Sequence, residues 1–492
     1  MKQPQPRQAG ILLHVTALPG PQGCGSFGEE AMAWISLLAR HGLGVWQVLP
    51  LAPTDATGSP YSSPSGSALN PCLLDAAELV ASGFLSPDHP GHTDLAPALR
   101  AHWDRAPLVQ QQAFARWRRQ QRHWLLDHCR FGVLKRDQNG TPWWAWPKPL
   151  ASRQPAALRR LDRDRSGPLL EEALLQWHLH RQWQRLHQHA QAEGVSLVGD
   201  LPFYVARDSA DVWSHPSLFS IRSDGSLIQQ SGVPPDYFST TGQLWGTPVY
   251  RWSAHWAGGF RWWIRRLRRQ LELFDLLRLD HFRAMQAYWS VPGNAPTAER
   301  GHWRLSPGWP LLGLLWLDSV RHRHLLGDGR LPLIAEDLGV ITPGVEWLRD
   351  GFRLPGMKIL QFAFDGDPNN AYLPNNFKGR RWVVYTGTHD NATTLGWWHS
   401  LDDEARNRVQ KALDGAVNAP GWQLTELALN SGADLAVVPL QDLLELCDEA
   451  RFNTPGTAQG NWAWRLQQPI ASLHDRLKGY GEMAARAGRG PG

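Results

Sequence analysis

The sequence predicts an α/β protein, a (β/α)8 TIM barrel with inserted, largely helical subdomains at the C-terminal face of its strands. Three observations lead to this fold class. Eight short runs have the aliphatic and β-branched density of buried strands, helical patterns fill several of the gaps between them, and the carboxylates Asp280, Glu336 and Asp390 close three of the runs. Alternating strands and helices favour a parallel sheet, and eight repeats suggest that it closes.

The eight predicted strands follow one another along the chain, each before turn residues or polar groups. They are residues 10–16, 45–51, 195–200, 274–280, 331–336, 358–364, 382–386 and 434–440. Continuous apolar runs of this kind are typical of parallel strands that are covered on both faces. Helical patterns are clear in residues 28–41 and 259–273, which lie between predicted strands.

The gaps between strands are uneven, and the long ones predict insertions. Residues 52–194, between the second and third strands, far exceed one crossover helix and indicate an inserted helical subdomain. Residues 201–258, between the third and fourth strands, are rich in Gly, Pro, Ser and aromatic residues and predict a lid of long loops. The barrel with its insertions is expected to be one catalytic unit over residues 9–482, with flexible ends at 1–8 and 483–492.

Composition excludes several classes of protein. The chain of 492 residues is 42% hydrophobic and has no low-complexity blocks, which argues against a disordered or fibrous protein. No apolar run approaches the roughly 20 residues of a membrane helix, so we expect a soluble cytoplasmic protein without a membrane partner.

The four widely separated cysteines favour reduced thiols. The 27 tryptophans exceed the 8 tyrosines, and a minority of them could stack on sugar rings.

The net charge of +5 is mild for this length, and the arginine-rich stretches are interpreted as solvated helix faces, so no nucleic-acid partner is expected. The run Arg321-His322-Arg323-His324 lacks carboxylates at ligand spacing, and no Gly-rich phosphate loop is present. We therefore assign no metal and expect no cofactor.

Three carboxylates close predicted barrel strands and are the candidate catalytic groups. Arg278 and Asp280 are two residues apart on a strand, so their side chains should project together. A guanidinium beside a carboxylate favours its ionised form, which suits Asp280 as a nucleophile. Glu336 follows an apolar approach that would hold it protonated as an acid catalyst, although alternation leaves open whether Glu336 or Asp337 points inward. Asp390, beside His389, is the third acid.

Each acid also has a structural explanation. Arg278 and Asp280 could form a buried ion pair, Glu336 and Asp337 could cap a helix, and His389 with Asp390 could belong to a zinc site, a phosphate site or a turn. What favours an active site is that the acids end the fourth and fifth strands and follow the seventh, and a parallel barrel gathers its strand ends on one face.

Long motifs extend this interpretation. They are Ser59-Pro60-Tyr61, residues 199–205, 232–238, 242–246, 278–282, 335–339, 388–391 and 453–462. On these motifs the chain resembles the 4-α-glucanotransferases of the amylomaltase (disproportionating enzyme) family, a branch of the α-amylase superfamily, from about residue 10 to residue 466. The resemblance implies a (β/α)8 barrel that transfers segments between α-1,4-glucans or maltooligosaccharides by a retaining mechanism, through a covalent glycosyl-enzyme.

The resemblance also implies roles for individual residues. It makes Asp280 the nucleophile, Glu336 the acid/base and Asp390 the stabiliser of the transition state, and so favours Glu336 over Asp337. The implied substrate-binding residues are Ser59, Tyr61, Tyr237, Phe238, Trp245, Arg278, His281, Asp365, His389 and Asn461. Tyr237 and Phe238 match the mobile loop that covers the donor chain in this family. Thr247 departs from the family pattern, since many relatives have Asn there.

Two rival functions belong to other classes. A hydrolase of α-glucans could use the same barrel and the same acids. A non-catalytic glucan-binding protein could keep the barrel, but it would have no need to bury three anions together. We expect the protein to be a monomer.

Overall fold

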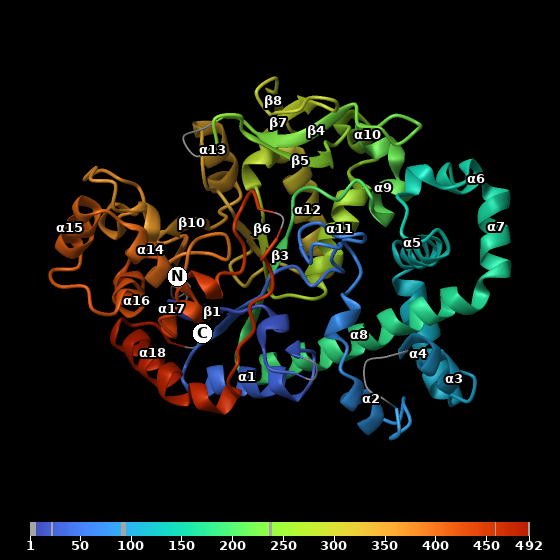
Figure 1. Ribbon diagram of the computed structural model, residues 1–492, viewed down its shortest axis with the longest axis horizontal. Helices are drawn as coiled ribbons and strands as arrows, with labels where there is room; N and C mark the ends of the chain where they lie inside the picture. Colours follow the sequence, from blue (N-terminus) through green and yellow to red (C-terminus); the bar gives the residue numbers. More distant parts are fainter. Residues whose placement is uncertain (1–5, 21–22, 90–94, 236–238, 458, 491–492) are drawn as a thin grey trace.

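The computed structural model describes residues 6–20, 23–89, 95–235, 239–457 and 459–490. Its centre is an eight-stranded parallel sheet in the order β10-β11-β12-β1-β2-β3-β6-β9. The strands are β1 (Gln8–Leu12), β2 (Val45–Gln47), β3 (Ser196–Leu201), β6 (Leu276–Leu279), β9 (Leu333–Ala335), β10 (Gly356–Ile359), β11 (Trp382–Tyr385) and β12 (Leu435–Pro439). The amide of Ala335 donates to the carbonyl of Pro355, 2.8 Å away, across the gap between β9 and β10. The predicted (β/α)8 barrel is confirmed (Figure 1).

The barrel has two separate apolar layers. Its inner core consists of Leu12, Val45, Val198, Ile334, Met357, Ile359, Val383, Tyr385, Leu435 and Val437. A much larger cluster packs outside the strands, against the helices. The two layers follow from alternation, because successive side chains of a strand point to opposite faces. Gly10 is required in β1, since a Cβ atom there would lie 2.5 Å from Cβ of Val45 on the neighbouring strand.

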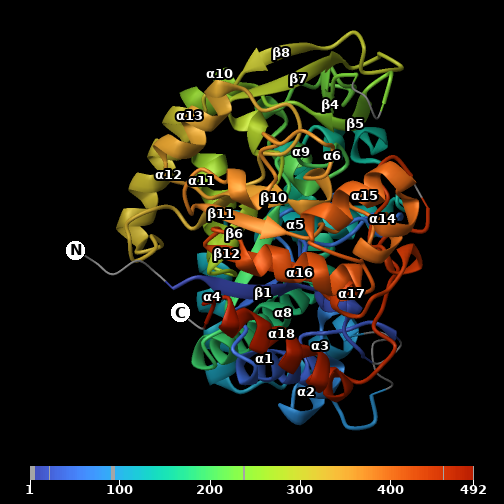
Figure 2. The same ribbon diagram turned by 90° about the vertical axis from the view of Figure 1, so that its left-hand side faces the viewer.

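Helices cover the outside of the barrel (Figures 1 and 2). They are α1 (Glu29–Arg40), α11 (Arg261–Leu271), α12 (Gly308–His322), α13 (Pro343–Gly351), α14 (Thr394–Ser400), α15 (Asp403–Ala412), α16 (Pro420–Asn430), α17 (Leu440–Leu443) and α18 (His474–Arg486). In α1, Ala31, Trp34, Ile35 and Leu38 are buried at helical spacing, so one face of the helix packs on the core. Residues 360–381, between β10 and β11, contain two 3-10 turns and no α-helix.

Residues 52–194 are largely helical. They contain α2 (Ala76–Ala81), α3 (Leu95–Trp103), α4 (Leu108–Gln120), α5 (Leu125–Asp137), α6 (Lys148–Ala151), α7 (Pro155–Asp164) and α8 (Ser166–Ala192). The 27-residue helix α8 packs against α3 and α5 of this segment and also against α1 and β3 of the barrel. One helix therefore serves both as part of the inserted segment and as the crossover that leads into the third strand.

Residues 201–258 are more regular than the expected lid of loops. They contain α9 (Ala210–Ser214), β4 (Gln229–Val233), β5 (Gln243–Pro248) and α10 (Trp252–Ala257). Strands β4 and β5 join β7 (Ala287–Pro292) and β8 (His302–Leu305) in an antiparallel sheet ordered β5-β4-β7-β8, on the far side of the barrel from α1 and α18 (Figure 2). The expectation of irregular loops is wrong for these strands. Strand β5 pairs with β4, and β4 pairs in turn with β7, which lies about 60 residues further along the chain, beyond any local pattern.

The expectation of flexible ends is wrong for residues 7, 8 and 483–489. Gln8 begins β1, and α18 continues to Arg486. Arg489 is 2% exposed and donates to the carbonyls of Leu429 and Ser431 at the end of α16. These carbonyls have no partner within the helix, so the buried guanidinium satisfies them. Across the described residues, no helix is both long and apolar enough to cross a membrane.

Candidate active site

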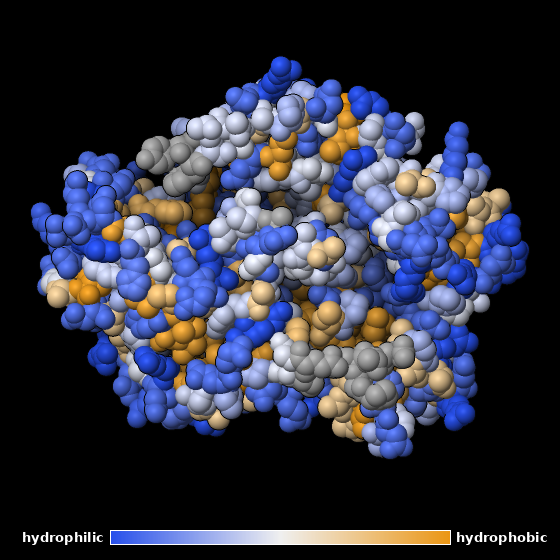
Figure 3. Space-filling model, viewed as in Figure 1, coloured by the Kyte–Doolittle hydropathy of each residue, from blue (hydrophilic) through white to orange (hydrophobic). Residues whose placement is uncertain are grey.

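The three predicted acids meet in one cleft. Asp280 directly follows β6, Glu336 directly follows β9, and Asp390 lies in the turn after β11. All three line a cleft of about 1190 Å³, and the space-filling view in Figure 3 shows the hollowed face of the molecule. Side chains that are more than 50 residues apart in the sequence become neighbours because parallel strands end on the same side of a barrel.

Arg278 holds two acids on one side of the cleft. Its guanidinium is 3% exposed and lies 2.6 Å from Oδ2 of Asp200 and 3.1 Å from Oδ1 of Asp280. The spacing of two residues does place Arg278 and Asp280 side by side, as alternation predicts. Asp200, the third member, was missed as a site residue. The rule that found the other acids, a carboxylate at the end of a barrel strand, applies to it as well.

The ambiguity between Glu336 and Asp337 is resolved by where each carboxylate points. Glu336 lines the cleft. Its carboxylate accepts a hydrogen bond of 2.6 Å from the amide of His281 and a second from the amide of Leu338. Asp337 is 7% exposed and turns into the barrel wall, where it accepts from Arg349 and from the amide of Met357. Glu336 therefore faces the site, and Asp337 belongs to the structure of the wall.

The two carboxyl groups near Arg278 differ in their protonation. Burial, together with the charge of Asp280, raises the pKa of Glu336 to about 8, against an ordinary value of 4.5. Burial also raises the pKa of Asp280 to about 6, and the nearby Arg278 limits that rise. The expectation that Arg278 alone would leave Asp280 with a lowered pKa is wrong, because burial and the neighbouring acids outweigh it. At neutral pH, Glu336 is protonated and Asp280 is ionised.

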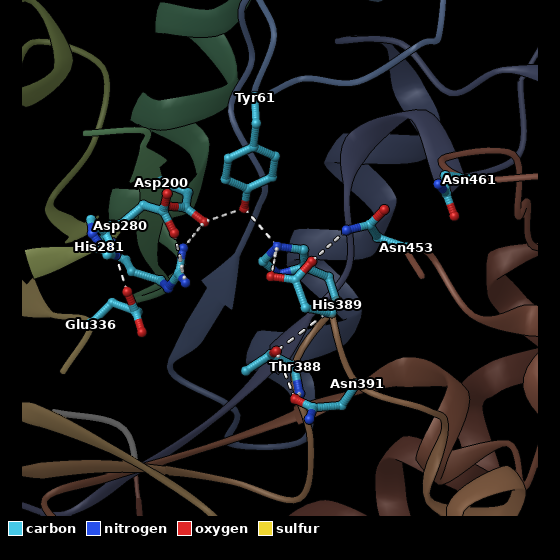
Figure 4. A network of polar contacts seen from close by, with 12 residues as sticks. Tyr61, Asp200, Asp280, His281, Glu336, Thr388, His389, Asn391, Asn453 and Asn461 are labelled. Atoms are coloured by element: carbon cyan, nitrogen blue, oxygen red, sulfur yellow. Dashed lines mark hydrogen bonds and ion pairs between the residues drawn. The ribbon is translucent and has the colours of Figure 1, made fainter. Parts of the chain in front are cut away.

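Asp390 contacts His389 and Asn453, which Figure 4 shows across the cleft from Asp280 and Glu336. Its Oδ1 accepts a bond of 2.6 Å from Asn453, and its Oδ2 lies 3.2 Å from Nε2 of His389. Burial opposes ionisation here, but the charge of His389 and the hydrogen bonds from His389 and Asn453 outweigh it and lower the pKa of Asp390 below its usual range. This acid stays an anion through the physiological range.

Tyr61 connects the two sides of the cleft (Figure 4). Its hydroxyl donates to Oδ2 of Asp200 at 2.7 Å and lies 2.8 Å from Nε2 of His389. Its ring stacks on the imidazole of His389, with ring centroids 5.2 Å apart. A continuous chain of polar contacts thus runs from Asp390 through His389, Tyr61, Asp200 and Arg278 to Asp280.

The predicted substrate-binding residues fall into three groups. Ser59, Tyr61, Trp245, Arg278, His281, Asp365 and Asn461 line the cleft. His389 is buried behind it and acts on the cleft through Tyr61 and Asp390. Tyr237 and Phe238 lie outside the described residues. The side chain of Asn461 bonds to Thr454 and Thr457 of its own loop, which gives it a role in loop shape as well.

Aromatic and amide groups complete the cleft. The indole of Trp245 meets the imidazole of His281 edge to face, with centroids 4.9 Å apart, and both pack near Tyr204. His281 adopts a left-handed backbone with φ of 50°, which orients its amide toward Glu336. Within the described residues, no group of three or more His, Cys, Asp and Glu side chains could hold a metal ion.

A (β/α)8 barrel with a protonated and an ionised carboxyl group side by side in a sugar-sized cleft defines an enzyme that acts on glycosidic bonds. Comparison with known proteins gives the family. A family profile described as 4-alpha-glucanotransferase matches residues 13–471. The chain therefore belongs to the 4-alpha-glucanotransferase family and is a glucan-transferring enzyme, as the sequence resemblance implied.

Three relatives illustrate the similarity. The 4-alpha-glucanotransferase of Thermus thermophilus is 44% identical over 94% of this chain and 95% of its own. The 4-alpha-glucanotransferase of a Synechocystis strain is 43% identical over 96% of each chain. Among solved structures, an amylomaltase from Streptococcus agalactiae in complex with acarbose matches with a TM-score of 0.91 and 31% identity, over 98% of this chain and all of that one.

Proposed function

We propose that this enzyme moves a segment of an α-1,4-glucan to the 4-hydroxyl of a second glucan or of glucose, with retention of the α configuration. Asp280 is the nucleophile, Glu336 the acid/base and Asp390 the stabiliser of the transition state. The observation that carries the proposal is that Asp280, held by Arg278, and Glu336, held by the amide of His281, face the same cleft, with burial raising the pKa of Glu336 above that of Asp280. A retaining mechanism needs one protonated and one ionised carboxyl group.

In the first step, Glu336 donates its proton to the bridging oxygen of the bound glucan. The leaving segment departs with that proton, and an oxygen of Asp280 forms a bond to the anomeric carbon from the opposite face. Arg278 and the chain of contacts behind it hold the Asp280 carboxylate in place for this attack. The product of the step is a covalent β-glycosyl-enzyme and a deprotonated Glu336.

In the second step, Glu336 acts as a base and takes the proton of the acceptor's 4-hydroxyl. The acceptor oxygen then displaces Asp280, and the second inversion restores the α configuration. Transfer must compete with water, so the acceptor sugar has to be held against the intermediate. We assign this positioning to the cleft residues and to the loop that carries Tyr237 and Phe238.

Asp390 is suited to stabilise the oxocarbenium-like transition state. Its lowered pKa keeps it an anion at neutral pH, and it lies beside His389, which Figure 4 shows across the cleft from Asp280 and Glu336. With His389, it also offers hydrogen bonds to sugar hydroxyls, and such contacts contribute several kcal/mol in glycosidases generally. The amylomaltase neighbour is described with acarbose bound, which supports a sugar as the occupant of the corresponding cleft here.

Incubation with maltotriose tests the reaction. A transferase yields glucose and a ladder of longer maltooligosaccharides, which chromatography resolves. A hydrolase instead gives glucose and maltose without the ladder, and a binding protein leaves maltotriose unchanged. The Asp280→Asn variant should lose turnover and remain folded, whereas Asp403→Asn, at a carboxylate that is 99% exposed on α15, should keep wild-type activity.

Trapping the intermediate tests the residue roles. In Glu336→Gln, an α-maltosyl fluoride donor still reacts, because fluoride leaves without a proton, but no base remains to activate an acceptor. Peptide mass spectrometry should then find the glycosyl group on Asp280. A glycosyl group on another side chain, or rapid turnover of the fluoride donor, would reject the assignment.

Three further expectations from the sequence stay predictions. We propose that the enzyme works as a monomer in the cytoplasm and needs no cofactor. Light scattering on the purified protein, fractionation of the producing cells and assay after dialysis against a chelator check these three points.

A further inference from the structure

A second cavity, of about 270 Å³, lies apart from the active cleft. It is a partly open pocket where the inserted helical segment meets the barrel, between the start of α5, helix α9 and the pair α10 and α11. The labels of α5, α9 and α11 in Figure 1 mark this region. It shares no lining residue with the cleft that holds Asp280, Glu336 and Asp390.

The volume favours a small ligand. Cavities that hold drug-sized molecules measure roughly 300–1,000 Å³, and one water occupies roughly 30 Å³ of liquid. At about 270 Å³ the cavity is too small for a glucan chain and far larger than a site for one buried water. It matches a molecule the size of one or two sugar rings.

The lining offers hydrogen-bond acceptors with spare capacity. The bonds to Asp127, from Arg130 and Arg153, go to its Oδ1, and the bond to Asp211, from the amide of Gly66, goes to its Oδ2. One oxygen of each carboxylate thus has no protein partner among the described residues. Carboxylate oxygens of this kind accept bonds from sugar hydroxyls.

Hydrogen-bond donors and an aromatic side chain also line the cavity. The Nδ1 of His215 lies 2.7 Å from the hydroxyl of Ser214, which itself donates to the carbonyl of Asp211, so donation to a ligand falls to the arginines of the lining. Arg265 is exposed on α11, and the half-buried indole of Trp262 lies one turn before it. Acceptors, donors and an aromatic face together are what a sugar ring requires.

The charges in the wall favour a neutral ligand over an anion. The lining holds three arginines, and of these Arg266 already donates to the carbonyls of Pro202 and Phe203. Burial lowers the pKa of His215, and lowers that of His255 to about 4, so these imidazoles are uncharged at neutral pH. A phosphate would face the free oxygens of Asp127 and Asp211, and such like-charge contacts are costly.

We propose that this cavity is a second sugar-binding site, separate from the catalytic cleft, for a neutral monosaccharide or disaccharide. The identity of the ligand rests on the proposed function, because glucose and maltose are the small sugars that glucan transfer releases. A site of this kind would let the enzyme respond to the sugars that it produces.

Filling the cavity tests the proposal. Ala254 lines it from α10, and Ala257 lies on the same helix, exposed and outside the lining. Ala254→Phe should therefore remove the second site, and Ala257→Phe is the matched control. Arg266 is left unchanged, because the backbone that it holds at residues 202–204 also lines the active cleft.

Glucose and maltose are titrated by calorimetry into the full chain carrying Glu336→Gln, which blocks turnover. We expect a saturable class of sites that is lost with Ala254→Phe and kept with Ala257→Phe, and density for glucose in the cavity of soaked crystals. The milder Asp211→Asn, which keeps an acceptor for Gly66, should weaken binding if Ala254→Phe fails to fold.

Other results would overturn the proposal. Equal sugar binding by Ala254→Phe and Ala257→Phe, an empty cavity at saturating glucose, or inorganic phosphate in the cavity in place of glucose would each reject a neutral sugar site. The maltotriose assay on the same variants without Glu336→Gln separates the two hypotheses, because the product ladder depends on the catalytic cleft and not on this cavity.

Discussion

At the scale of single residues, the proposed function depends on which of two adjacent acids faces the cleft. Glu336 and Asp337 are neighbours in the chain, yet one faces the cleft and the other is paired with Arg349 inside the barrel wall. The same peptide therefore supplies the proposed acid/base, Glu336, and a structural group, Asp337. Their variants should fail in different ways.

Glu336→Gln should lower kcat on maltotriose by about 10²–10⁴-fold, the usual contribution of a general acid/base, while the protein stays folded. Asp337→Asn should instead lower the free energy of unfolding by about 1–3 kcal/mol, because it removes the charge opposite the buried Arg349. Steady-state kinetics and urea unfolding of both variants check this. A large loss of kcat with unchanged stability in Asp337→Asn would reverse the assignment.

The pH dependence of kcat/KM should be bell-shaped. The rate should rise as pH increases through about 6, where Asp280 ionises, and fall as pH increases through about 8, where Glu336 loses its proton. A pH profile measured below KM tests both limbs. The alkaline limb should vanish in Glu336→Gln, and its persistence would show that another group supplies the proton.

The Glu336 carboxyl should also lower the free energy of unfolding at alkaline pH. Its pKa is about 8 in the folded enzyme against an ordinary 4.5, so the folded state holds the extra proton between these values and stability declines as pH rises across that range. Glu336→Gln should therefore raise Tm relative to wild type at pH 9 and change it little at pH 4. Calorimetric scans at the two pH values check the sign, which a lower Tm at pH 9 would contradict.

At the scale of elements, the barrel strands supply the acids and the connections shape the cleft. Trp245 reaches the cleft from β5 of the four-stranded sheet, and Tyr61 and Ser59 come from the segment after β2. Because these connections are long, they cover the site without disturbing the strand ends that position the acids.

Tyr237→Ala or Phe238→Ala should raise the ratio of hydrolysis to transfer severalfold, because the loop that carries them is proposed to hold the acceptor and limit water. The ratio is measured as reducing ends formed per maltooligosaccharide lengthened. Trp256→Ala, at an indole 59% exposed on α10, is the control and should leave the ratio unchanged. An unaltered ratio in both loop variants would count against the lid.

At the scale of the whole molecule, the chain ends hold the barrel together. Arg489 donates to the carbonyl of Gln8 at the start of β1 as well as to the end of α16, so this arginine ties the first strand to the helix that precedes the eighth strand, β12. A fold that closes on itself in this way gains from contacts between the most distant parts of its sequence.

Arg489→Ala should lower the free energy of unfolding by about 1.5–3 kcal/mol, the range for hydrogen bonds to a charged group, because it removes the donor to the buried carbonyl of Leu429. Arg486→Ala, at an exposed position on α18, should change it little. Urea unfolding followed by far-UV circular dichroism gives both values. Equal stability of the two variants would mean that the chain end contributes nothing.

The sequence by itself determined the barrel and its three acids. Strands that are apolar on both faces have a strong local signature, and residues such as Asp280 and Glu336 can be placed at strand ends by counting. The chain of contacts through Asp200 could have been found by the same rule, but its partners Tyr61 and His389 could not, since nothing local brings them together.

Only the tertiary structure shows which way Glu336 and Asp337 point, that β4 pairs with the distant β7, and that Arg489 is buried. It also decided the protonation of Asp280, where burial outweighs the adjacent Arg278. The physical reason is common to these cases. Each depends on contacts and desolvation between segments far apart in the chain, whereas periodicity and spacing report on neighbours along it.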